Sequence, residues 1–308
     1  MDVLTHYEVR KSKKQKTAFL TAVTAYATSQ RYSSKIEKGQ FGCRNLVIGD
    51  AEHAEYLITA HYDTCAWMPI PNFVTPFNLP VYILYQIVLL AVMLAGAIVP
   101  GMLARLLGAS EEVALSVAGI FYWIWIFALM FGPANRHCAN DNTSGVVTLL
   151  EIMASMPDNL RGKVAFVLFD MEEAGLIGSA SYRKSHKSAT DRQIVLNMDC
   201  VGDGDEIVLI PNKRLRRDDC AMAKFQPLCG SFGCKSLHVH RKGFVFYPSD
   251  QANFPLGVAI AALRCNRWIG RYYGRIHTHR DTVLDRTNVN VLRAALISLI
   301  ASVTIKDI

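Results

Sequence analysis

Acidic side chains follow a buried-looking apolar run near the middle of this 308-residue chain. Residues 164–169 contain no charge, as in a strand buried on both faces, and Asp170, Glu172 and Glu173 come directly after them. Carboxylates in such a place cost several kcal/mol in desolvation unless a cation or hydrogen bonds compensate them. The carboxyl edge of an open α/β sheet is also where ligands bind. A lone Glu-Glu pair is more often a solvated loop, so the assignment of a site depends on the rest of the chain.

Further acids and histidines stand at comparable places. His61 follows a predicted strand at 55–60, and Asp63, two residues on, points the same way and could orient the imidazole ring. Asp141 precedes a helical pattern, where an N-cap is the simpler interpretation. Asp199 ends a predicted strand at 194–198, and His277 precedes a closing helix at 289–303. The pattern indicates a shared site at one sheet edge.

Together these side chains have the chemistry of a metal centre. Nitrogen and oxygen ligands without a thiolate suit catalytic zinc, or manganese or cobalt. Five ligands with one shared carboxylate would form a two-metal site, and a sixth carboxylate beside it would accept a proton from water. The candidates are His61, Asp141, Glu172, Glu173, Asp199 and His277.

Two long apolar segments interrupt the chain between His61 and Asp141. Residues 81–99 and 113–132 contain no charged side chain, and as helices each would be roughly 28–30 Å long, which matches a hydrocarbon core. Pro100 and the polar residues up to Glu112 predict a turn between them. We expect a transmembrane hairpin at 78–132, inserted into one discontinuous catalytic domain at 1–77 and 133–308. A hairpin buried in the domain or an apolar dimer interface is the alternative.

Composition narrows the functional class. The formal charge of +7 is modest, and no nucleic-acid motif is present, so we expect no nucleic-acid partner. The basic run at 10–16 is interpreted as a solvated helix start, with attraction to an anionic membrane as the weaker alternative. The N-terminus lacks the apolar core of a secretory signal, and the eight cysteines are expected to be reduced thiols. These features favour a cytosolic catalytic domain. Cys229 and Cys234 have no second pair that would complete a zinc finger.

Five segments in the order HYDT, DNTSG, DMEEAGLIGS, NMDCVG and IHTHRDT resemble the family of co-catalytic dizinc aminopeptidases and glutamate-carboxypeptidase-like exopeptidases. SDQANFPLGV is similar to that family's segment before its last core strand. The resemblance covers roughly residues 40–65 and 135–303. It implies a three-layer α/β fold with a mixed, mostly parallel central sheet and helices on both faces. The hairpin replaces what is a short connection in ordinary members.

The resemblance also implies roles for individual residues. His61 and Asp199 would bind one zinc ion, Glu173 and His277 the second, and Asp141 would bridge them. Glu172 would be the general base. Around the metals, Asp63 would orient His61, and Asp281 would support the His277 loop. The Asp141–Asn142 peptide would be cis. His279 is not counted as a ligand.

The favoured function is therefore that of a membrane-anchored, two-zinc aminopeptidase acting on peptides with a free N-terminus. A glutaminyl-cyclase-like enzyme with one zinc is the alternative within the fold, and a non-catalytic membrane receptor or scaffold is the alternative outside enzymes. Four arginines before the His277 loop could bind a substrate carboxylate, although ordinary surface charges are the favoured interpretation: Arg264, Arg267, Arg271 and Arg275.

Overall fold

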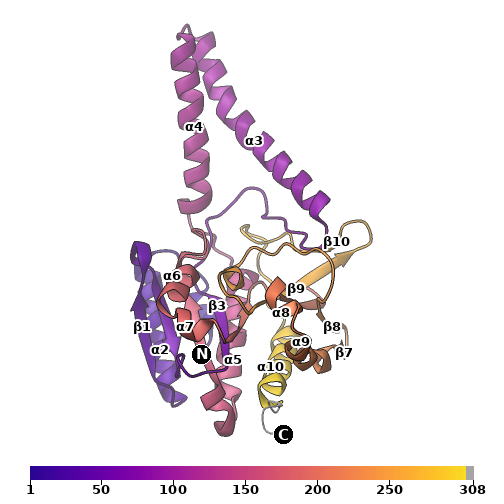
Figure 1. Cartoon of the computed structure of the whole chain (residues 1–308). Helices are drawn as coiled ribbons and strands as arrows, with labels where there is room; N and C mark the ends of the chain where they lie inside the picture. The colour runs from indigo at the N-terminus through magenta and orange to yellow at the C-terminus, as the bar shows by residue number, and fades with distance from the viewer. Residues whose placement is uncertain (303–308) are drawn as a thin grey trace.

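The computed structural model describes residues 1–302, which form one α/β body with a long helical hairpin projecting from it (Figure 1). One mixed sheet of ten strands runs through the described body in the order β1-β2-β4-β3-β5-β9-β6-β8-β7, with β10 paired to β9. Its strands are β1 Ser34–Lys38, β2 Arg44–Ile48, β3 Tyr56–His61, β4 Val164–Phe169, β5 Ile194–Met198, β6 Glu206–Pro211, β7 Gly230–Phe232, β8 Lys235–Val239, β9 Gly257–Asn266 and β10 Gly270–Tyr272.

The centre of the sheet is parallel, and outside it every strand pairing except the parallel β6–β8 pair is antiparallel. β4, β3, β5 and β9 pair in parallel, whereas β1–β2, β2–β4, β6–β9 and β7–β8 pair antiparallel. β3 and β4 are buried along their whole length, as the unbroken apolar sequence of β4 predicts for that strand. The predicted mixed sheet is confirmed, and so are the bounds of the strands that the sequence predicts at 44–48, 164–169 and 194–198.

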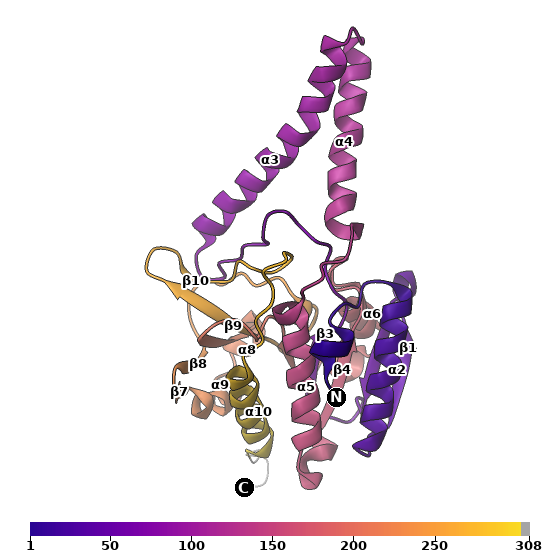
Figure 2. The same ribbon diagram turned by 180° about the vertical axis from the view of Figure 1, so that it is seen from behind.

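Helices cover both faces of the sheet, which confirms the three-layer prediction. Figure 2 shows α2 (Lys13–Ser29), α5 (Gly145–Ser155) and α10 (Arg286–Ala301) on one face, where they form the main apolar core. On the other face, Tyr182 of α6 (Ile177–Ser185) packs with Phe169 and Phe254. The shorter helices are α1 Val3–Tyr7, α7 Lys187–Thr190, α8 Lys213–Arg216 and α9 Asp219–Phe225.

The hairpin consists of α3 (Leu79–Leu106) and α4 (Glu111–Phe131). Both helices are long and apolar enough to cross a membrane, and only 11% and 6% of their most apolar windows are buried in the protein. The predicted end of the first span at Pro100 is wrong, because α3 continues through Pro100 to Leu106. A Cβ at Gly101 would lie 2.7 Å from the Ala114 carbonyl, so the two helices are in close contact at this point.

Two further predictions differ from the structure. The sequence also predicts a helix at 221–232, but α9 ends at Phe225, because Pro227 follows and the β-hairpin of β7 and β8, turning at Gly233, contains the later residues. The basic run at 10–16 is not entirely solvated, because the Arg10 side chain is fully buried. The predicted last residue of the closing helix, Val303, lies outside the described residues.

Candidate metal centre

The six candidate residues lie together where the central parallel strands end. His61 is the last residue of β3, Glu172 and Glu173 follow β4, and Asp199 is the first residue after β5. Parallel pairing of these strands brings their carboxyl ends to the same sheet edge. Asp141 comes from the turn before α5, and His277 from the loop before α10.

Asp141 lies between the two histidines. Its Oδ1 is 3.3 Å from His61 Nε2, and its Oδ2 is 3.2 Å from His277 Nε2. Asp199 Oδ1 lies 3.6 Å from His61 Nε2, and Glu173 Oε2 lies 3.4 Å from His277 Nε2. The side chains therefore form two groups, which share one carboxylate through its two oxygens.

These separations fit zinc. Ligands about 2.0–2.1 Å from a tetrahedral zinc ion stand roughly 3.3 Å from one another, close to the distances in both groups. His61, Asp141 and Asp199 are buried, and Glu173 Oε1 is buried without a hydrogen-bond partner among residues 1–302. A cluster of carboxylates withdrawn from water is stabilised by a bound cation or else stays partly protonated. Both groups could therefore hold a divalent metal.

A hydrogen-bonded frame fixes the Asp141 turn. The Asp281 carboxylate accepts hydrogen bonds from the N–H groups of Asn140, at 2.7 Å, and Asp141, at 3.0 Å. The Asn142 amide donates to the Met198 carbonyl at 2.9 Å, and the Asp141–Asn142 peptide is cis, as the resemblance implied. Asp281 thus joins the His277 loop to the Asp141 turn, a broader role than support of its own loop.

Asp63 holds the glutamate pair. Its carboxylate accepts hydrogen bonds from the N–H groups of Glu172, at 3.1 Å, and Glu173, at 3.3 Å. The His61 ring contacts the Asp63 backbone carbonyl, 3.2 Å from Nδ1, more closely than the carboxylate at 3.6 Å. The ring is therefore oriented by the Asp63 carbonyl, while the carboxylate positions the proposed base and its neighbour.

The electrostatics of the centre reflect burial and mutual charge. Burial raises the pKa of Glu172 well above its usual range and that of Glu173 to about 8. Burial opposes protonation of His277, but Glu173 and Asp141 raise its pKa to about 9. Burial likewise opposes ionisation of Asp141, yet the two imidazoles lower its pKa. Without metal, the centre thus keeps protons on Glu172, Glu173 and His277. Bound cations would take over the compensation of the carboxylate charge.

Three nearby residues escaped the sequence reasoning. Cys65 is buried beside Glu173 and His277, and Asp250 is a buried carboxylate whose pKa burial raises to about 7. Arg10 donates from Nε to the Tyr62 carbonyl and from Nη1 to Thr143 Oγ1 at 3.1 Å. No local pattern marks Arg10, since the Tyr62 and Thr143 partners of its side chain lie more than 50 positions away. Asp250 lies in the SDQANFPLGV segment, which was the one available signal for it.

Arg10→Met is expected to destabilise the protein by at least about 2 kcal/mol. Two buried acceptors would lose their donors, and an unsatisfied buried group costs about 1–3 kcal/mol. Thermal unfolding of the detergent-solubilised protein measures the effect. Lys14→Met, at an exposed position of the same basic run, should leave the unfolding temperature unchanged. Equal unfolding temperatures for both variants would contradict a structural role for Arg10.

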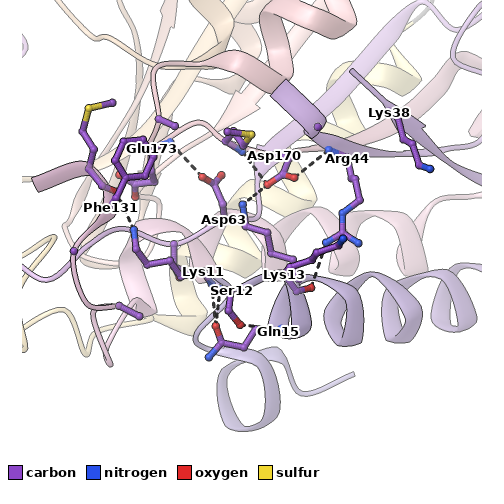
Figure 3. Close-up of a pocket in the computed structure, with 18 residues that line it drawn as sticks. Lys11, Ser12, Lys13, Gln15, Lys38, Arg44, Asp63, Phe131, Asp170 and Glu173 are labelled. Atoms are coloured by element: carbon purple, nitrogen blue, oxygen red, sulfur yellow. Dashed lines mark hydrogen bonds and ion pairs between the residues drawn. The ribbon is translucent and has the colours of Figure 1, made fainter. Parts of the chain in front are cut away.

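Two cavities flank the segment that carries the glutamate pair. The smaller, about 310 Å³, is lined by Asp141, Glu172, Glu173, Asp199 and His277, together with Asn72 and Tyr273. The larger, about 1040 Å³, lies on the side of Asp63 and Asp170, between the start of α2 and the end of α4 (Figure 3). Lys11, Lys13, Lys38 and Arg44 give this second cavity a basic wall. The small acidic cavity is therefore the one lined by the candidate metal ligands and by Glu172.

Comparison with known proteins supports the family expected from the sequence. No curated protein matches the chain in sequence. Among solved structures, the LapA aminopeptidase of Legionella pneumophila is 13% identical, with a TM-score of 0.56 over 96% of this chain and 68% of its own. Porphyromonas gingivalis glutaminyl cyclase is 15% identical, with a TM-score of 0.59 over 95% and 91% of the two chains. At this identity the likeness establishes the fold. The sequence model of peptidase family M28 matches residues 126–300, more than half of the chain, and this protein therefore belongs to peptidase family M28.

Proposed function

We propose that this M28 peptidase is a membrane-anchored exopeptidase with two zinc ions, which removes N-terminal residues from peptides. The observation that carries the proposal is the Asp141 carboxylate, whose two oxygens face His61 and His277 at 3.3 and 3.2 Å. Shared carboxylates of this kind join paired metals in hydrolytic enzymes. His61 and Asp199 would hold one zinc, and Glu173 and His277 the other.

Bound zinc would supply Lewis acidity toward the scissile carbonyl and would lower the pKa of a water molecule. Glu172 is the proposed general base, because a ligand atom of its carboxylate lies within 4.8 Å of those of His61 and Glu173 and its own burial favours proton uptake. The proton held on Glu172 is then available to the leaving amine. Asp63 keeps Glu172 in place through the backbone N–H of that residue.

The cavity favours a terminal residue over an internal segment of a long chain. A volume of about 310 Å³ is at the lower end for ligand pockets and suits one side chain with its amino group. Its carboxylates would attract a positively charged amino terminus. The four arginines before the His277 loop already contact other side chains. Arg264 and Arg275 contact Asp203, Arg271 contacts Glu206, and Arg267 stacks on Trp268. These contacts support the interpretation of surface charges over a subsite for a substrate carboxylate.

Metal content separates this proposal from its alternatives. Two equivalents per chain are expected for the peptidase, one for a glutaminyl-cyclase-like enzyme, and none for a receptor or scaffold. The gathering of all six residues at one sheet edge supports the peptidase, since ligands are present for both metal positions. A panel of aminoacyl and dipeptide substrates, with N-terminal glutaminyl peptides included to detect cyclisation, would test the reaction directly. Cyclised product in place of free amino acid would overturn the proposal.

Glu173→Ala is expected to bind one zinc equivalent in place of two, because the group with His277 loses a carboxylate ligand while the group with His61 and Asp199 stays intact. Elemental analysis of the purified protein counts the metal directly. Asp170→Asn is the matched control, since Asp170 ends the same strand but faces Lys16, and it should retain both metals. Two equivalents in Glu173→Ala would refute the assignment of Glu173.

The hairpin at 78–132 is proposed to cross the bilayer, with residues 1–77 and 133–308 forming one cytosolic domain. The exposure of α3 and α4 supports this, because helices so apolar and so little covered by protein need lipid around them. The strand pairing supports a discontinuous domain, because β3 precedes the hairpin and pairs with β4 and β5, which follow it. An even number of spans returns the chain to the same side.

A further inference from the structure

We propose that the thiolate of Cys65 is a ligand of the second metal position, beside Glu173, His277 and Asp141. The inference rests on the proposed metal centre and deepens it. It assigns sulfur to a site that the sequence pattern indicated to be purely nitrogen and oxygen.

Three ligand atoms from separate segments converge on this position. Cys65 Sγ, a Glu173 carboxylate oxygen and a His277 ring nitrogen all lie within 4.8 Å of one another. In a tetrahedron with zinc–sulfur bonds of about 2.3 Å and zinc–nitrogen bonds of about 2.0–2.1 Å, sulfur and nitrogen stand roughly 3.6 Å apart. The sulfur–nitrogen separation therefore exceeds that of a zinc site by at most about 1.2 Å, a difference that side-chain rotation can remove.

The surroundings of Cys65 hold it against the centre. Its side chain is fully buried, and its backbone carbonyl accepts a hydrogen bond from Asn135 N–H at 3.2 Å. The neighbouring residues Ala66 and Ala134 form a β-bridge, which ties the segment leaving β3 to the segment returning from α4. Glu173 contributes a further sign of an incomplete site, since its Oε1 is buried and has no hydrogen-bond partner in the described chain.

A sulfur ligand would make the two metal positions unequal. With Asp141 as the proposed bridge, Cys65, Glu173 and His277 would complete four protein ligands, the number found in closed zinc sites. His61, Asp141 and Asp199 supply three, which leaves a coordination position free, as in catalytic sites. Thiolate is also a soft ligand that favours zinc over manganese or magnesium. The second position should therefore exclude manganese even where the first accepts it.

The test is titration of the metal-free full-length protein with Co²⁺, followed by absorption spectroscopy. The protein background carries serine in place of the four exposed cysteines, so that these cannot bind cobalt: Cys220, Cys229, Cys234 and Cys265. We expect a near-ultraviolet sulfur-to-cobalt charge-transfer band that Cys65→Ser abolishes and Cys138→Ser, at a neighbouring buried cysteine, retains. Cys65→Ser should also lower the zinc affinity of the second position. Loss of a residue that only hydrogen-bonds to a ligand typically lowers metal affinity by roughly 10- to 100-fold, and loss of a ligand should lower it by more.

Each outcome has a defined meaning. Two bound cobalt ions without the band, or a band that disappears with Cys138→Ser, would overturn the proposal for Cys65 while leaving the metal centre intact. Failure to bind cobalt at all would contradict the proposed function itself. If Cys65→Ser does not fold, ¹¹³Cd NMR of the protein with Cys65 intact decides the question, because a thiolate ligand shifts one of the two cadmium resonances strongly downfield and its absence leaves both in the nitrogen and oxygen range.

Discussion

Glu172→Gln is expected to lower kcat by a factor on the order of 10²–10⁴ while the protein keeps both metals, the range for lost general acid–base catalysis. Glutamine has nearly the same shape as glutamate but cannot accept a proton from water. Its backbone N–H would still donate to Asp63, so the position of the segment should not change. Because Glu172 is not among the proposed ligands, KM and metal content should stay close to those of the unaltered protein.

Stopped-flow or steady-state assays on the zinc-loaded enzyme measure this effect, with elemental analysis on the same sample. Glu151→Gln, on the solvent side of α5, is the control and should have unaltered kcat. A Glu172→Gln enzyme with full turnover would show that another group accepts the proton, and Asp250 would be the next candidate. Loss of a metal in that variant would instead place Glu172 among the ligands.

The double variant Val92→Arg with Phe121→Arg is expected to release the protein from membranes on alkaline carbonate washing, whereas the unaltered protein stays in the pellet. Each arginine near the middle of a span costs about 2.5–3.5 kcal/mol on insertion scales, so the pair should prevent stable insertion. Both side chains are exposed on the hairpin, so the catalytic body should not be affected. Centrifugation after the wash, with immunoblotting of both fractions, gives the result.

Leu107→Arg is the matched control, because Leu107 is 87% exposed in the turn between the helices, and this variant should stay in the pellet. Leu107→Cys, in the background without other exposed cysteines, tests sidedness. An impermeant maleimide should label it in intact cells if the body is cytosolic. Release of the unaltered protein by carbonate would refute the spans, and labelling only after lysis would refute the orientation.

The sequence was sufficient for the parts of the molecule that local patterns specify. The unbroken apolar run of β4 and its acidic end gave both a strand and its functional edge, because burial on both faces leaves a signature in consecutive residues. The end of α3 was not predicted, because proline usually ends or kinks a helix, whereas α3 continues through Pro100 to Leu106. The roles of Cys65 and Arg10 depend on partners brought close by the fold, so spacing along the chain could not indicate them.

The position of β3 in the sheet has a consequence for the order of folding. Before residue 79 is synthesised, β1–β2 is the one strand pairing of the described sheet that can form. The other partners of β2 and β3 are β4 and β5, and both of these strands follow the hairpin in the chain. The apolar central strand therefore stays unpaired until more than 100 further residues, including the whole hairpin, have left the ribosome. Unpaired apolar strands are prone to aggregation, and pairings so distant in sequence form slowly. With the hairpin in a bilayer as proposed, β3 and β4 can pair only when both ends of the hairpin lie on the same side. Insertion of a single helix would therefore separate His61 from the other residues of the proposed centre.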